Sequence, residues 1–138
     1  MGIFRRRQKQ PALPNDIIPM MERFGRFEFD PQGSGEDAGD IWGQWAERVI
    51  PFAEADPNGF LIALAEAVLP VGGWAVYGAS RTIWECFSSK EVIRQHPSYK
   101  AIMSAALEFL RTSGVRLGDL RPYEREYWLA SGGTIDTW

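Results

Sequence analysis

The sequence has few of the side chains on which most catalytic and metal-binding sites depend. Among its 138 residues there is one histidine, His96, and one cysteine, Cys86. A lone histidine does not complete an ordinary zinc site, and a nucleophilic Cys–His pair would require Cys86 and His96 to meet in space. A single cysteine also cannot form an intrachain disulfide, which favours a reducing compartment, and we expect a cytoplasmic location.

Sequence motifs of the common enzyme families are absent as well. The chain has no Gly-x-Ser-x-Gly, no phosphate-binding glycine loop, no dinucleotide fingerprint and no His-Glu-x-x-His. The segment from Asp30 begins like a calcium-binding loop, with Ser34 and Gly35 in place, but Gln32 and Ile41 stand at two positions that must supply ligands. We therefore predict no catalytic residue, no metal and no cofactor, and we lean against an enzymatic activity.

Long apolar segments are absent too, and the charge is unevenly distributed. No stretch approaches the roughly 20 consecutive apolar residues that cross a bilayer, so we expect no integral membrane association. Residues 1–10 carry four basic and no acidic side chains, whereas the other 128 residues carry 11 basic and 18 acidic ones. We interpret residues 1–14 as a flexible basic leader on an acidic body. Because phosphate neutralisation supplies much of the affinity for nucleic acids, this body argues against specific nucleic-acid binding.

Aromatic residues, in contrast, are abundant, and they recur at helical spacing. The chain has six tryptophans, eight phenylalanines and four tyrosines, and 45% of its residues are hydrophobic. Apolar side chains repeat every three or four residues over most of the chain, as in helices with one buried face. We predict a mostly α protein, with residues 15–138 as a single compact domain of five to six short helices around an aromatic core. At most a minor extended segment is expected, near residues 26–29.

Turn and cap residues suggest where these helices begin and end. Asn15 or Asp16 can cap a first helix that Gly25 would stop, and Pro51 should end or kink the second helix near residue 50. Asp119 can cap the last helix. The predicted helices cover residues 17–24, 36–50, 57–68, 74–87, 98–111 and 119–128, with a short turn at residues 91–95.

Two groups of residues are candidates for a binding site. On the predicted helix 74–87, Trp74 points to the same side as Arg81 and Glu85, away from the apolar face. Arg81 and Glu85 are four residues apart and are expected to form a surface ion pair. A large indole on a polar face often anchors a partner or lines a ligand cleft. A second aromatic group lies near the C-terminus and comprises Tyr123, Tyr127 and Trp128.

These observations favour a protein that works by binding another protein. An acidic, compact domain without catalytic motifs would suit a basic partner, as in an immunity-like inhibitor, because complementary charge accelerates encounter. One alternative is a small-molecule or enzymatic pocket lined by Trp74, Tyr77 and Trp84, in which Arg81 would hold an anion. The other alternative is a structural subunit that forms a homodimer.

Overall fold

The structure is a computed structural model that describes residues 11–138, so the basic residues 1–10 of the predicted leader lie outside the described part. Within the described chain, Pro14 is buried and Leu13 packs against the core. The α-helices are α1 (Ile17–Phe29), α2 (Ala38–Ala55), α3 (Pro57–Val68), α4 (Gly73–Phe87), α5 (Glu91–Arg94), α6 (Pro97–Thr112) and α7 (Pro122–Ala130), and a 3-10 turn, η2 (Leu117–Asp119), precedes α7.

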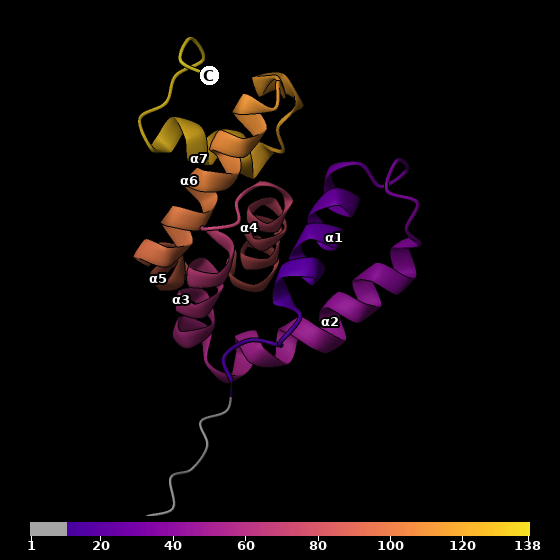
Figure 1. The fold of residues 1–138 in the computed structure, drawn as a ribbon. Helices are drawn as coiled ribbons and strands as arrows, with labels where there is room; N and C mark the ends of the chain where they lie inside the picture. Colours follow the sequence, from indigo (N-terminus) through magenta and orange to yellow (C-terminus); the bar gives the residue numbers. More distant parts are fainter. Residues whose placement is uncertain (1–10) are drawn as a thin grey trace, which may run out of the picture.

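The mostly α fold predicted from the periodicity is confirmed. The described residues contain seven α-helices and no strand, and α4 lies in the middle of the bundle with α1, α3 and α6 around it (Figure 1). None of the described helices is long and apolar enough to cross a membrane. The short helix α5 lies near the start of α6, and the C-terminal helix α7 packs against α6 further along it (Figure 1).

Helix α1 packs on α4 in an antiparallel register that two glycines make possible. Met21 meets Thr82, Gly25 meets Gly78, and Phe29 meets Trp74. A Cβ atom added at Gly25 would lie 2.5 Å from the carbonyl oxygen of Trp74, and one at Gly78 would overlap the carbonyl of Met21. Because neither glycine has a side chain, the two backbones approach more closely than ordinary helix packing allows.

Aromatic and aliphatic side chains from five helices fill the core, as the composition suggested. Phe24 stacks on Trp45 and meets Trp42 edge-on, which joins α1 to α2. The Trp45 indole also donates a hydrogen bond of 2.9 Å to the Thr82 hydroxyl of α4. The indole N–H of Trp45 is therefore satisfied within the core, as a buried polar group requires.

A smaller apolar cluster around Tyr77, Leu107, Leu110 and Leu120 lies between α4, α6 and the segment that enters α7.

Three of the expected helix boundaries differ from the structure. Residues 26–29 are helical rather than extended, and Gly25 lies inside α1 because its close contact with α4 needs a helical backbone there. Pro51 does not end α2. Pro51 has no N–H to donate to the carbonyl of Glu47, but both residues face solvent, so the helix tolerates the missing bond. Asp119 belongs to the 3-10 turn, and α7 begins instead at Pro122, where the Arg121 amide donates to the Glu124 side chain.

Replacement of Gly78 tests the close approach of α1 and α4. Gly78→Ala is expected to lower the free energy of unfolding by about 3 kcal/mol or more, since the new methyl group meets backbone atoms that cannot rotate away. Gly43→Ala is the matched control, because Gly43 also lies inside a helix but has open space around it, and it should raise stability by about 0.5–1 kcal/mol. Urea unfolding followed by circular dichroism measures both; equal effects would contradict the proposed contact.

Candidate functional site

The most unusual polar feature of the molecule is a buried arginine cluster formed by Arg81, Glu28, Tyr123 and Glu85. Arg81 is only 3% exposed, and its Nε and Nη2 atoms donate to Glu28 Oε1 at 3.0 and 2.8 Å. Its Nη1 atom donates to the Tyr123 hydroxyl at 2.7 Å, and Nη2 also reaches Glu85 Oε1 at 2.9 Å. The cluster therefore ties α1, α4 and α7 together through one guanidinium group.

This cluster corrects the expectation that Arg81 and Glu85 form a surface pair. The two side chains are paired as predicted, at 2.9 Å, but Arg81 is buried and its main partner is Glu28 of α1. The helical wheel placed Arg81 on the polar side of its helix, yet α1 and α7 cover that side as well. A guanidinium that is saturated in this way has a structural role and is not free to bind an external anion.

Burial and pairing set the ionisation of the cluster. Burial alone would lower the pKa of Arg81, but the hydrogen bonds to Tyr123 and Glu28 and the negative charge of Glu28 outweigh it and raise the pKa overall. The pKa of the Tyr123 hydroxyl is raised mainly by burial. Arg81 is therefore permanently charged and Tyr123 permanently neutral at physiological pH, so neither group is suited to proton transfer there.

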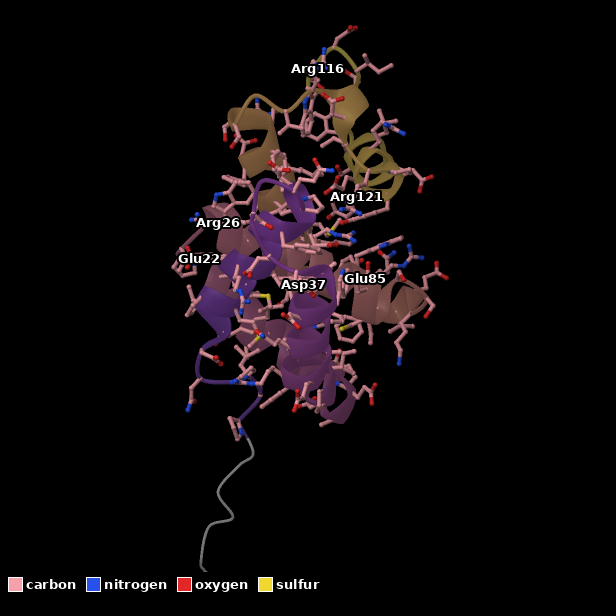
Figure 2. The ribbon with its side chains drawn as sticks, turned by 90° about the vertical axis from the view of Figure 1, so that its right-hand side faces the viewer. Glu22, Arg26, Asp37, Glu85, Arg116 and Arg121 are labelled. Atoms are coloured by element: carbon pink, nitrogen blue, oxygen red, sulfur yellow. The ribbon has the colours of Figure 1, made fainter. Side chains whose placement is uncertain are left out.

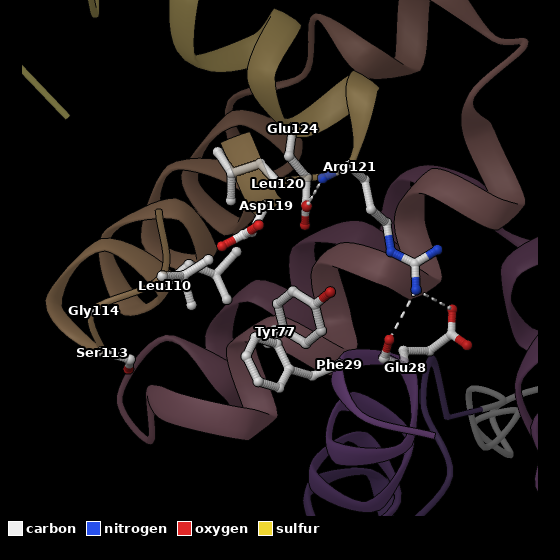
Figure 3. A pocket seen from close by; sticks show the side chains of 11 residues that line it. Glu28, Phe29, Tyr77, Leu110, Ser113, Gly114, Asp119, Leu120, Arg121 and Glu124 are labelled. Carbon is white, nitrogen blue, oxygen red and sulfur yellow. Dashed lines mark hydrogen bonds and ion pairs between the residues drawn. The ribbon is translucent and has the colours of Figure 1, made fainter. Parts of the chain in front are cut away.

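Beside this cluster lies a polar cleft of about 570 Å³, which is defined by Tyr77, Glu124, Arg121 and the end of α6 (Figure 3). Arg121 donates through Nη2 to the carbonyl oxygen of Glu28 at 2.8 Å, and the Arg121 amide donates to Glu124 Oε1 at 2.8 Å. Burial raises the pKa of Tyr77 to about 12 and also raises the pKa of Glu124. The cleft is thus lined by groups that mostly pair with each other and hold α7 against α1.

A second, aromatic cleft of about 470 Å³ opens between α4, α5, α6 and α7. Trp84 and Tyr123 form one wall and stack face to face, with ring centroids 4.1 Å apart and planes at 4°. Tyr99 lies in the wall from α6, and Tyr127 donates from its hydroxyl to the Lys100 carbonyl at 3.2 Å. Arg94 of α5 also lines this cleft.

Trp74 lies in an aromatic patch at the ends of α1 and α4, which we define by Phe29, Val71, Trp74 and Phe109. The Trp74 ring meets the rings of Phe29 and Phe109 edge-on, at centroid distances of 5.2 and 5.0 Å, and the Arg26 guanidinium lies 5.9 Å from its centroid. Trp74 is half-buried by these contacts, whereas Phe29 remains 43% exposed and Val71 52% exposed. Trp74 therefore supports an exposed apolar surface instead of standing alone on a polar face.

The C-terminal aromatic residues are divided between different surroundings. Tyr123 and Tyr127 line the aromatic cleft, but Trp128 packs edge-on against Trp138 at a centroid distance of 5.2 Å. The indole of Trp128 donates to the Thr134 carbonyl, and that of Trp138 donates to the Val115 carbonyl. Trp128 therefore anchors the C-terminal segment on α7 and the residues that follow α6.

The small-molecule pocket suggested by the sequence is not assembled as expected. Trp74 lies in the aromatic patch, Tyr77 lines the polar cleft, and Trp84 lines the aromatic cleft. Arg81, which was expected to hold an anion, is already occupied by Glu28, Glu85 and Tyr123. Trp74 and Tyr77 meet edge-on, with ring centroids 6.2 Å apart, but Trp84 lines a different cleft and Arg81 is buried in its own cluster.

The other reactive residues considered from the sequence have local roles. The Ser98 amide donates to His96 Nδ1, so His96 caps α6, and burial raises the pKa of the Cys86 thiol to about 12. Asp30 accepts from the Gly33 amide in its turn, and Asp37 caps α2. Within residues 11–138 no three His, Cys, Asp or Glu side chains gather in a way that could hold a metal ion.

Two residues that matter for these sites were missed by the sequence analysis. Glu28, the main partner of Arg81, fell in the segment that seemed extended, and Arg94 fell in a short turn. The sequence does contain a signal for Glu28. If the first helix is extended through residue 28, Glu28 lies on the same side as Met21, Phe24 and Gly25. No comparable pattern pointed to Arg94.

Comparison of the chain with protein-family models, with curated proteins and with solved structures found no match. The interpretation of its function therefore depends on the residues and their geometry.

Removal of one partner tests whether the buried cluster is a structural device. Arg81→Met is expected to cost about 3–5 kcal/mol in the free energy of unfolding, because Glu28 would stay buried without its partner. The double variant Glu28→Met with Arg81→Met should recover much of that loss. Arg116→Met is the control and should change stability by less than about 0.5 kcal/mol, since its ion pair with Asp119 is exposed. A double variant less stable than Arg81→Met would contradict this view.

The raised pKa of Glu124 predicts that the stability of the protein depends on pH. Its pKa is raised in the folded state by burial, above the ordinary value of 4.5, so its stabilising effect is complete below that value and is lost as the pH rises through the folded-state pKa. Glu124→Gln keeps the oxygen that accepts the Arg121 amide and removes the ionisation. The stability of this variant relative to the unsubstituted protein should therefore increase from pH 4 to pH 7 in urea unfolding. A pH-independent difference would show that burial does not perturb Glu124.

Proposed function

We propose that this protein is a small interaction module that binds a basic partner protein, and that the aromatic patch of Phe29, Val71, Trp74 and Phe109 is the centre of the contact. The observation that carries the proposal is the exposure of Phe29 beside the fixed ring of Trp74, together with the exposed Val71 in the turn that leads into α4. Interface centres commonly consist of aromatic residues held rigidly by their neighbours. An exposed apolar patch with a polar border is typical of such a surface.

The surroundings of the patch are consistent with a protein interface. A shallow hollow beside Trp74 contains Arg23, Arg26, Asp30 and Glu36, so its formal charge is balanced. Arg23 pairs with Glu36, and Arg26 lies over the Trp74 ring. Glu22 and Arg26 extend outward from α1, as Figure 2 shows. Such a rim of mixed charge around an apolar centre can provide hydrogen bonds to a partner.

The preference for a basic partner follows from the neighbouring helix α2. Asp40, Glu47 and Glu54 are exposed and seven residues apart, so they form an acidic stripe along one side of this helix. Among the ion pairs of the described residues, none involves these three carboxylates. Unpaired surface charge of one sign attracts an oppositely charged protein during encounter. A cytoplasmic location, inferred from the single cysteine, belongs to the same proposal.

Substitution of the two exposed patch residues tests the function. Phe29→Ser with Val71→Ser should reduce capture of the partner from the source lysate at least tenfold, because the apolar centre of the contact would be lost. Val92→Ser is the matched control, since Val92 is an 86% exposed apolar residue on α5, and it should leave capture unchanged. Quantitative mass spectrometry of the captured proteins provides the measurement. Identical capture by both variants would exclude the patch as the binding surface.

Charge neutralisation and sedimentation separate the remaining possibilities. Asp40→Asn, Glu47→Gln and Glu54→Gln together should slow association with the captured partner severalfold at low salt, and the difference should vanish at high salt. An effect that persists at high salt would contradict steering by charge.

If the unsubstituted protein sediments as a dimer and Phe29→Ser with Val71→Ser as a monomer, the patch joins two copies and the homodimer alternative is correct.

A further inference from the structure

The aromatic cleft between α4, α5, α6 and α7 is separate from the proposed interaction surface and has the properties of a small-molecule site. Its volume of about 470 Å³ lies within the range of about 300–1,000 Å³ that is usual for ligand pockets. None of the four residues of the aromatic patch lines this cleft. A ligand here would therefore bind independently of a protein partner at Trp74.

The walls of the cleft favour a flat ring. Trp84 and Tyr123 are stacked in parallel, and Tyr123 is fixed from behind by its hydrogen bond to Arg81. Tyr127 is held by its hydrogen bond to the Lys100 carbonyl, and Tyr99 is buried in the wall of α6. Rings whose positions are fixed in advance lose little conformational entropy when they stack against a ligand.

The charge of the cleft favours an anion. Arg94 and Lys100 line it, against the single carboxylate of Glu126, and neither cation takes part in an ion pair among residues 11–138. The Nε atom of Arg94 is the one fully buried side-chain nitrogen or oxygen in the described chain that has no hydrogen-bond partner. A buried donor without an acceptor is costly, so a change of rotamer that lets this N–H meet a ligand oxygen would be stabilising.

We propose that the aromatic cleft binds a small aromatic carboxylate, with the ring against Tyr123, Tyr127 and Trp84 and the carboxylate on Arg94. The planar edge of a guanidinium, formed by Nε and one Nη atom, matches the two oxygens of a carboxylate. Because Nε is covered from solvent, a rotation of the Arg94 side chain must expose this edge when the ligand enters. Lys100, which also lines the cleft, supplies a second positive charge.

The experiment titrates the full-length protein with naphthalene-2-carboxylate and with its methyl ester, using isothermal titration calorimetry. The acid should bind saturably, and the uncharged ester should bind at least tenfold more weakly. Arg94→Gln should weaken binding of the acid about tenfold or more and leave binding of the ester unchanged. Arg111→Gln is the control, because Arg111 is a half-exposed arginine of α6 that pairs with Glu108, and it should bind the acid normally.

Several results would overturn the proposal. Absence of saturable binding of the acid at about 10 mM, equal affinity for acid and ester, or unchanged affinity in Arg94→Gln would each exclude an anion site at Arg94. Circular dichroism melting shows whether the Arg94→Gln protein is folded. If it is not, Arg94→Lys replaces it: this variant keeps the charge but loses the planar edge, and should still bind the acid severalfold more weakly than the unsubstituted protein. Unchanged affinity in Arg94→Lys would also overturn the proposal.

Discussion

The close contact between Gly25 of α1 and Gly78 of α4 is the constraint on which the rest of the structure depends. Without side chains at these two positions the backbones of α1 and α4 meet directly, and this contact sets both the distance and the register of the two helices. The register in turn places Phe29 beside Trp74 and brings Glu28 within reach of Arg81. Helix packing that is fixed at one point leaves little freedom for the side chains on either side of it.

The buried charge of Arg81 extends this constraint to α7. A guanidinium enclosed by protein is stable only when its donors are satisfied, and Arg81 needs groups from three helices to achieve this. Arg121 adds a hydrogen bond from the start of α7 to the backbone of α1. The cluster therefore matters more for the position of α7 than for the stability of the fold. The position of α7 in turn creates the polar cleft and one wall of the aromatic cleft.

The two proposed binding surfaces have a common physical origin. Many aromatic residues are buried in the core, but others near the ends of helices, such as Phe29, Trp74 and Trp84, remain partly exposed. At the ends of α1 and α4 they form an exposed apolar patch, to which a protein partner is suited. Between α4 and α7 they form the walls of a cleft of limited volume, to which a small flat molecule is suited.

The sequence by itself determined the helical fold, most of the helix boundaries and the aromatic character of the core, because these follow from local periodicity and from cap residues such as Asp56. It also identified Trp74, Arg81 and Tyr123 as residues of interest. Only the tertiary structure decided that Arg81 is buried, that Gly25 continues a helix and that Arg94 faces an aromatic cleft. A helical wheel distinguishes one face of a helix from another, but it does not show which further helices cover the polar face.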